Sequence, residues 1–166
     1  PQNPQSRLLK QAVAILRDGG IIVYPTDSCY ALACQIGNKD AMNRIRAIRQ
    51  VDEHHHFTLV CRDLAEIATY AKVDNSQFRL LKANTPGSYT FILQASKEVP
   101  RRLQHPKRNT IGLRIPDHPV AHALLAELDE PILSSTLILP GDELPLTDPE
   151  EIRHQLEHHN GRILDV

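Results

Sequence analysis

GGIIVYPTDSCYAL, residues 19–32, is the stretch of sequence that decides how this chain folds. A diglycine precedes the apolar run 21–24, and a short apolar run bounded by Gly and Pro predicts a buried strand. Pro25 has no amide hydrogen and a fixed φ, so we expect the strand to end there. Four side chains able to hydrogen-bond follow: Thr26, Asp27, Ser28 and Tyr30. Because open α/β sheets bind ligands at strand ends, these residues predict a binding turn, the alternative being an ordinary turn.

Helices and strands alternate along the rest of the chain. Apolar spacing predicts helices at 6–18, from Asn38 or Asp40 to Arg49, from Asp63 onward, at 76–83 and at 119–128, and strands at 57–61, 89–94, 110–115 and 131–136. This order, with one closer strand pair around Tyr89 and Thr110, predicts an α/β fold. We expect a single domain over residues 1–166, with a twisted mixed sheet flanked by helices.

The C-terminal part of the sequence is less regular. Residues 139–149 are rich in Pro, Gly, Asp and Glu and predict a surface loop. Asp148 and Pro149 then open an acidic helix with Ile152 and Leu156 inward. Residues 162–166 resemble a strand that stops in mid-course, which suggests that part of the native chain is missing.

Composition excludes several classes of protein. Hydrophobic residues make up 41% and charged residues 23% of 166 residues, which suits one globular domain. The 19 Lys and Arg against 20 Asp and Glu leave a formal charge of -1, so nucleic acid could be bound only through local patches. Three cysteines, an odd count, suggest reduced thiols and a cytoplasmic protein. No signal peptide is evident and no apolar run approaches about 18 residues, so no membrane is expected.

Polar residues recur at other predicted strand ends. They are the turn 85–90, with Ser88 and Thr90, the run 134–136, and Arg114 before Pro116. An arginine in such a place can hold a carboxylate or phosphate bidentately. Each feature alone also fits an ordinary turn or surface residue, but together they predict one pocket for a small polar or phosphorylated ligand. Neither a Walker-type phosphate loop nor a dinucleotide fingerprint is present.

These stretches also resemble a known family. PTDSCYAL (25–32), PGSYT (86–90) and IGLRIP (111–116) are similar, in order and spacing, to Pro-Thr-Glu-Thr-x-Tyr-Gly-Leu, Pro-Gly-Pro-x-Thr and Arg-x-Pro of the YrdC/YciO family. The resemblance covers nearly the whole chain, and residues 48–50, 57–59 and 98–102 make the YciO branch the nearest. It implies a YrdC/RibB-like fold. The better-known members make threonylcarbamoyl-AMP from ATP, threonine and bicarbonate, for the t6A modification of tRNA.

The resemblance implies roles for individual residues. The amino-acid substrate would be held by Thr26, Ser28 and Tyr30. The nucleotide would be held by Arg49, His55, Ser88, Thr90, Arg114 and Thr136. ATP would arrive with Mg²⁺ carried on its phosphates, and we expect no tightly bound cofactor and no protein metal site. No covalent nucleophile is evident, so catalysis would rest on positioning and charge.

The sequence departs from the synthases at two positions. In an alignment on residues 57–59, the Lys-x-Arg of the synthases and their following Lys fall at Arg49, Val51 and His55. Their Thr-Ser-Ala-Asn corresponds to residues 135–138, where Ile138 takes the place of the asparagine. Each lost polar group would cost on the order of 10²–10³ in rate. The first hypothesis is therefore a nucleotidyltransferase of the threonylcarbamoyl-AMP synthase type, or a paralogue that keeps the ATP pocket with another substrate.

The second hypothesis is a non-catalytic protein of the same fold that binds tRNA, double-stranded RNA or a nucleotide. Two basic runs support it: Arg44 and Arg46, and Arg101, Arg102, Lys107 and Arg108. We expect the arginines of 44–49 to point largely outward. The runs lack interleaved aromatics and also fit plain solvated faces, but beside the pocket they would form a salt-sensitive RNA surface. Val51 and Ile138 favour this hypothesis, whereas the intact turn 26–30 favours the enzyme.

Histidine and cysteine patterns add little. Residues 54–56 and 158–159 are histidine runs without the spacing of metal ligands, so they predict solvated loops, although the resemblance places His54 and His55 over the nucleotide. Cys29 and Cys34 have no histidine nearby in sequence and are expected to be packing residues.

Overall fold

The computed structural model describes residues 5–51, 56–137, 148, 150–152 and 163–165. The helices are α1 (Ser6–Arg17), α2 (Lys39–Arg49), α3 (Leu64–Tyr70), α4 (Asn75–Asn84) and α5 (Pro119–Leu128), with a 3₁₀ turn η1 (Arg101–Leu103). The strands are β1 (Ile21–Pro25), β2 (Tyr30–Gln35), β3 (Thr58–Val60), β4 (Phe91–Gln94), β5 (Thr110–Arg114), β6 (Ile132–Thr136) and β7 (Ile163–Asp165).

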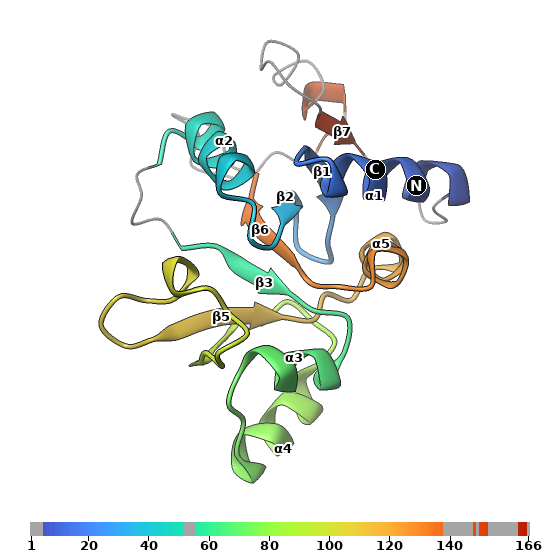
Figure 1. Cartoon of the computed structure of the whole chain (residues 1–166). Coiled ribbons are helices and arrows are strands. Elements are labelled where there is room, and N and C mark those ends of the chain that lie inside the picture. The colour runs from blue at the N-terminus through green and yellow to red at the C-terminus, as the bar shows by residue number, and fades with distance from the viewer. Residues whose placement is uncertain (1–4, 52–55, 138–147, 149, 153–162, 166) are drawn as a thin grey trace.

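The strands of the described chain form one seven-stranded mixed sheet in the order β4-β5-β3-β6-β2-β1-β7. The β3–β5 and β1–β7 pairs are parallel, and the β1–β2, β2–β6, β3–β6 and β4–β5 pairs are antiparallel. Figure 1 shows α1 and α5 beside each other at the β1 end, with α3 and α4 together at the other end, below β5. The predicted α/β fold with a mixed sheet flanked by helices is therefore confirmed.

Helix boundaries follow from local capping chemistry. Side chains of Asn38, Asp63 and Asp74 accept a backbone N–H of the first turn of α2, α3 and α4, which satisfies one of the donors that helices leave open there. α1 ends before Gly19, whose φ of +83° suits glycine. A Cβ at Gly19 would lie 2.9 Å from Asn38 Nδ2, so the same glycine lets the α2 cap approach.

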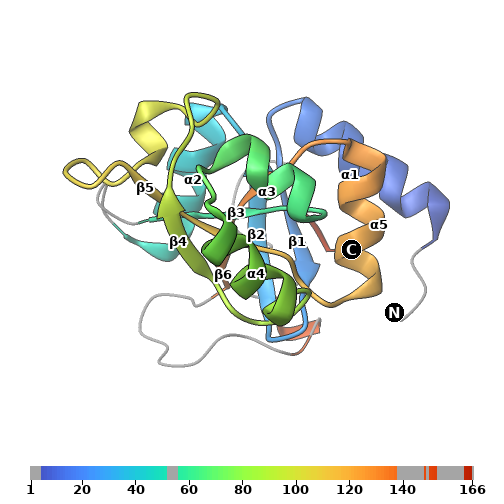
Figure 2. The ribbon, with the colours of Figure 1, turned by 90° about the horizontal axis from the view of Figure 1, so that it is seen from below.

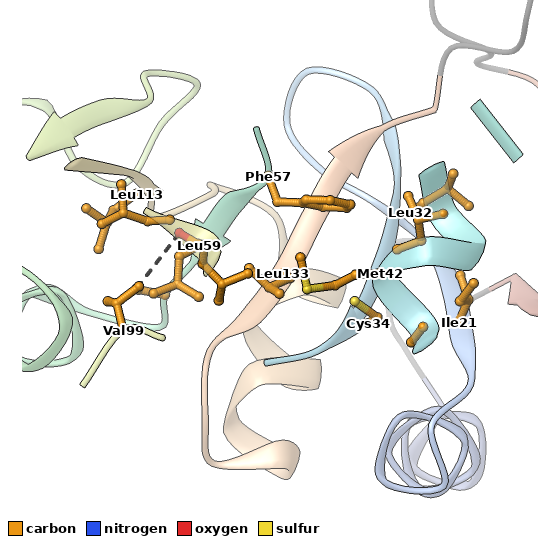
Figure 3. Close-up of a cluster of buried hydrophobic side chains, with 14 of the residues drawn as sticks. Ile21, Leu32, Cys34, Met42, Phe57, Leu59, Val99, Leu113 and Leu133 are labelled. Carbon is orange, nitrogen blue, oxygen red and sulfur yellow. Dashed lines mark hydrogen bonds between the residues drawn. The ribbon is translucent and has the colours of Figure 1, made fainter. Parts of the chain in front are cut away.

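One apolar cluster fills the sheet face below α2. Successive strand residues point to opposite faces, and Leu59, Leu113 and Leu133 of neighbouring strands point to this one. Figure 3 shows these leucines continuing into Phe57 and Met42, and then into Leu32 and Ile21. The cluster joins α2, α3, α4 and η1 to both ends of the sheet.

A second cluster fills only part of the opposite face. α1 and α5 pack there on Ile22 and Tyr24 of β1, Ala33 of β2 and Ile132 of β6. No described residue of β4 or β5 belongs to this cluster. Figure 2 shows both helices on the β1 side of the sheet. Beyond Val60 of β3, this face therefore lacks a helical cover among the described residues.

The structure also corrects several expectations. β2 was not predicted, and it makes residues 21–35 an antiparallel hairpin instead of a strand and a turn. β1 does end at Pro25 as expected, with Pro25 as its last paired residue, opposite Tyr30. The strands around 57–61 and 89–94 are shorter than expected. Arg44, Arg46 and Arg49 are half-buried rather than outward, because α2 lies against the sheet.

At the C-terminus, residues 150–152 are helical and Ile152 is buried, as predicted. The predicted loop 139–149, apart from Asp148, and Leu156 lie outside the described residues. β7 pairs with β1, which confirms the predicted strand near the end of the sequence. Among the described residues, no helix has the length and apolar character that a bilayer crossing requires.

Leu133 tests the importance of the first cluster. It lies at the centre of the sheet with 0% exposure, whereas Leu80 on α4 is 58% exposed. Leu133→Ala should lower the free energy of unfolding by about 2–5 kcal/mol, because it leaves a cavity in a packed core. Leu80→Ala, the matched control, should change it by less than about 0.5 kcal/mol. Urea unfolding measures both, and similar losses in the two variants would contradict this packing.

Candidate functional site

Polar side chains occupy the uncovered part of the second sheet face, which we call the open face. Thr58 of β3 lies between Ser134 of β6 and Gly112 of β5 in the strand register. These residues share the face of Val60 because strand side chains alternate with a period of two. Thr136, two residues beyond Ser134, lies opposite Ala31. An apolar face would need a covering helix, but this row of small and hydroxyl side chains leaves room for a ligand.

A cavity of about 60 Å³, the Arg114 pocket, opens on this row. Hydroxyl-bearing residues supply much of its lining: Tyr24, Thr26, Thr58, Thr90, Ser134 and Thr136. The other lining residues are Cys29, Ala31, Val60, Arg114 and Pro116. Arg114 is thus the sole charged group among the described residues that line it.

Arg114 is held from two sides. Its Nη2 forms an ion pair with the Asp27 carboxylate, and its Nε donates to the Gly87 carbonyl at 3.3 Å. The side chains of Arg114 and Asp27 are only 12% and 17% exposed. A guanidinium so far removed from water requires anionic or carbonyl partners, because burial of an unpaired charge is costly. Its position is therefore fixed at the edge of the pocket.

Thr26 organises the turn between β1 and β2. Its hydroxyl donates to the Cys29 carbonyl at 2.7 Å and accepts the Cys29 N–H at 3.2 Å. Its own N–H also donates to the Cys29 carbonyl, at 2.9 Å. These bonds close the turn, so that Asp27 at its tip reaches Arg114. The Thr26 side chain lines the pocket and shapes the turn at the same time.

Tyr24 forms the buried floor of the pocket. Its hydroxyl lies 2.8 Å from Ser134 Oγ, an interaction wholly inside the protein. Burial raises the pKa of Tyr24 to about 12, against the smaller lowering by the Ser134 hydrogen bond. The phenol is therefore neutral at physiological pH and orients the Ser134 hydroxyl.

A second cavity of about 210 Å³, the Gly112 cavity, shares Thr58 and Thr90 with the Arg114 pocket. Its walls are more apolar and include Ile92, Leu103 and Ile111. The absence of a side chain at Gly112 keeps it open, since a Cβ there would come within 3.2 Å of Thr90 Cγ2. The two cavities meet at Thr58 and Thr90, and the Gly112 cavity extends from there to Phe57, Leu103 and Ile111 of the first cluster.

The residues predicted to hold an amino acid do not all lie at the Arg114 pocket. Thr26 lines the Arg114 pocket, and Ser28 is exposed on the same turn, with its hydroxyl 3.2 Å from that of Thr26. Tyr30 packs against the first apolar cluster. It precedes Ala31 in β2 and so points to the opposite sheet face from the pocket.

Only some of the residues predicted to hold a nucleotide lie at the Arg114 pocket. Thr90, Arg114 and Thr136 line the Arg114 pocket, whereas Ser88 is exposed in the preceding turn. Arg49 donates from Nη1 to Ser135 Oγ at 2.7 Å, and Ser135 pairs with Leu32, whose side chain belongs to the first cluster. Burial lowers the pKa of the Arg49 guanidinium. His55 lies outside the described residues.

Among the hydroxyl-bearing lining residues, the sequence analysis missed two, Tyr24 and Thr58. The signal for Thr58 was present, because a hydroxyl interrupts the apolar run 57–61. Its direction depends on the register with Ser134 and Gly112, which requires the sheet order. Tyr24 sits in an apolar run and carries no local sign that its hydroxyl faces a pocket.

The basic residues of the RNA hypothesis meet at a third cavity, the Arg46 cavity, of about 670 Å³. Arg46, Arg101 and Arg102 line it, and Arg108 lines the Gly112 cavity. Lys107 is exposed and Arg44 half-buried, and neither contributes to these linings. Across the described ranges, no three His, Cys, Asp or Glu side chains gather as metal ligands would.

Comparison with known proteins identifies close relatives. A family model for Sua5, YciO and YrdC proteins, described as telomere recombination, matches residues 14–166. The uncharacterized protein YciO of Escherichia coli K12 is 61% identical over 157 residues, which cover 95% of this chain and 76% of YciO. The E. coli YciO crystal structure superposes with a TM-score of 0.92 at 58% identity, covering 99% of this chain and 80% of that one.

Relatives with a named activity are more distant. The threonylcarbamoyl-AMP synthase of Chromobacterium violaceum is 34% identical over 144 residues, covering 86% of this chain and 74% of the synthase. Sua5 of P. abyssi, crystallised with L-threonine, superposes with a TM-score of 0.83 at 21% identity. That match covers 97% of this chain and 47% of Sua5, and it shows a shared fold. The predicted family and its YciO branch are confirmed.

The cysteines provide a test of the pocket's accessibility. Burial raises the pKa of the Cys34 thiol to about 12 and that of Cys61 further, so both stay protonated at pH 8. Cys29 is half-exposed at the Arg114 pocket. We expect Ellman's reagent at pH 8 to label one thiol per folded chain rapidly and three in denaturant. Loss of the fast phase in Cys29→Ser would identify the thiol, and rapid labelling of a second thiol would contradict the structure.

Proposed function

Since the chain belongs to the Sua5/YciO/YrdC family, we propose that it binds ATP and a small substrate on the open face of its sheet. By analogy with the threonylcarbamoyl-AMP synthases among its relatives, the amine of an amino acid would combine with bicarbonate to a carbamate, with loss of water. The carbamate would then take the adenylyl group of ATP, with release of pyrophosphate. The protein would then act in the t6A modification of tRNA, or on another substrate in the same pocket.

The observation that carries this proposal is Arg114 at the edge of a hydroxyl-lined pocket. A largely desolvated guanidinium presents a fork of donors to a carboxylate or phosphate. In the free protein Asp27 occupies that fork. An anionic ligand would compete with Asp27 for Arg114, while Thr90 and Thr136 would donate to its remaining oxygens. Ligand binding thereby exchanges one anion for another rather than burying a new charge.

The two cavities together would hold one extended ligand. Sites for drug-sized molecules usually measure about 300–1,000 Å³, and the Arg114 pocket at about 60 Å³ and the Gly112 cavity at about 210 Å³ together come just under that range. A nucleotide would lie across Thr58 and Thr90, with its reacting phosphate at Arg114 and its less polar part against Ile92. Mg²⁺ would be carried by the phosphates.

Catalytic turnover is the more demanding part of the proposal. Val51 replaces a cation of the synthase motif, and Arg49 is directed to Ser135. Fixed positive charge near the phosphates contributes much of the rate of such transfers. We therefore expect this protein to keep more of the synthases' affinity for ATP than of their catalytic rate.

The second candidate function is RNA binding without catalysis. Exposed Arg101, Arg102, Lys107 and Arg108 lie close in sequence, and phosphate contacts of this kind give affinity with little sequence preference. tRNA or double-stranded RNA would bind with a steep salt dependence, and ATP with threonine would give no turnover.

Arg114→Ala tests the nucleotide site. Calorimetric titration with ATP and Mg²⁺ should show saturable binding to the wild-type protein and at least tenfold weaker binding to this variant, because a charge-assisted contact is lost. Arg62→Ala is the matched control, since Arg62 also pairs with a carboxylate, Asp129, but lines none of the three cavities. Unchanged ATP affinity in folded Arg114→Ala would refute the pocket assignment.

A turnover assay separates the two candidate functions. Wild-type protein with ATP, threonine and bicarbonate should release pyrophosphate, and Arg114→Ala should release at least 100-fold less. Saturable ATP binding without pyrophosphate release would instead indicate another substrate. Binding of RNA alone, lost as salt rises and little changed by Arg114→Ala, would favour the non-catalytic function.

A further inference from the structure

The Arg46 cavity has the composition of an anion site. Four cationic residues line it: Lys39 and Arg46 from α2, and Arg101 and Arg102 from η1. Among its described lining residues there is no Asp or Glu. In a chain whose net charge is -1, such a local excess of positive charge focuses an attractive field on anions.

The cationic side chains come from two structured segments, α2 and η1, that form opposite walls of the cavity. Lys39, Asn43 and Arg46 follow each other at intervals of four and three residues, so they share one face of α2. The opposite wall is tied to the chain before α2, because Arg102 Nη2 donates to the Gly37 carbonyl at 2.6 Å. The cavity of about 670 Å³ between them is large enough for a nucleotide-sized molecule.

Two contacts hold the Arg46 side chain in one orientation. Its guanidinium lies over the Phe57 ring, 5.2 Å from the ring centroid, and its Nη1 donates to Asn43 Oδ1 at 3.1 Å. Its Nε is buried and has no hydrogen-bond partner among the described residues. The Phe57 and Asn43 contacts fix the orientation of the side chain before any ligand arrives, which lowers the entropic cost of binding.

The floor of the cavity is apolar. Met42, Phe57 and Leu103 are buried core residues whose surfaces reach the lining. At one side the rings of His56 and His105 stack, with centroids 5.5 Å apart and planes 19° from parallel. A ligand here would place phosphates on the arginines and a flat or apolar portion on this floor.

We propose that the Arg46 cavity is a second binding site, separate from the Arg114 pocket, for a small organic molecule that carries two or more phosphates. A small ligand fits better than an RNA backbone, because Arg46 is half-buried in the wall of the cavity. The Arg46 cavity shares no described lining residue with the Arg114 pocket, although it adjoins the Gly112 cavity, with which it shares His56, Phe57, Leu103 and His105. Loss of Arg114 therefore leaves the four cations of the Arg46 cavity in place.

The test uses folded Arg114→Ala protein, so that the Arg114 pocket no longer contributes, and inorganic pyrophosphate and ADP as probes in calorimetry. We expect one equivalent of each to bind with a Kd below about 1 mM, and ADP to bind at least as tightly because of the apolar floor. Lys39→Gln with Arg101→Gln should weaken both by at least tenfold, since each charge-assisted hydrogen bond contributes about a factor of ten. Both residues are exposed, so the fold should be retained.

Lys82→Gln with Lys97→Gln is the matched control, because it removes two exposed charges that line none of the three cavities. It should leave both affinities within twofold.

Equal weakening by the two double variants, or no saturable pyrophosphate binding, would overturn the proposal. Binding of pyrophosphate without ADP would overturn the role of the apolar floor. Double-stranded RNA binding that depends on Lys39 and Arg101, with neither probe bound, would assign the cavity to an RNA surface. Failure of ATP turnover in the wild-type protein leaves these outcomes unchanged.

Discussion

The ion pair between Asp27 and Arg114 is the contact on which the open face depends. Arg114 ends β5 and Asp27 lies in the turn between β1 and β2, and β3 and β6 stand between β5 and β2 in the sheet. Neighbouring strands are about 4.8 Å apart, so the pair spans roughly three strand spacings. The Arg114 side chain and the turn after β1 therefore reach toward each other across β3 and β6. The hydroxyl-bearing pocket residues of β3 and β6 stand between the two charged groups in the order of the strands.

Local chemistry explains which elements could be predicted from sequence. α2, α3 and α4 have side-chain caps at Asn38, Asp63 and Asp74, and these signals are independent of the tertiary fold. β2 was missed because its sequence, YALACQ, is short and rich in alanine. Its conformation comes from pairing on both sides, with β1 and with β6. Strand identity there is a property of the sheet rather than of the six residues.

The residues of the candidate site that lie at strand ends could be predicted from the sequence. Thr26, Thr90, Arg114 and Thr136 lie at or near strand ends and line one pocket. The face to which a side chain points could not be predicted without the register, because a shift of one residue reverses every side chain. Tyr30 therefore faces the first apolar cluster although its neighbour Ala31 faces the pocket. Thr58 was missed for the same reason.

The same alternation places the Arg114 pocket and the Arg46 cavity on either side of the start of β3. Thr58 points to the open face and lines the Arg114 pocket, while the preceding Phe57 belongs to the first cluster and carries Arg46 on its ring. Both residues also line the Gly112 cavity, so that cavity adjoins the Arg114 pocket at Thr58 and the Arg46 cavity at Phe57.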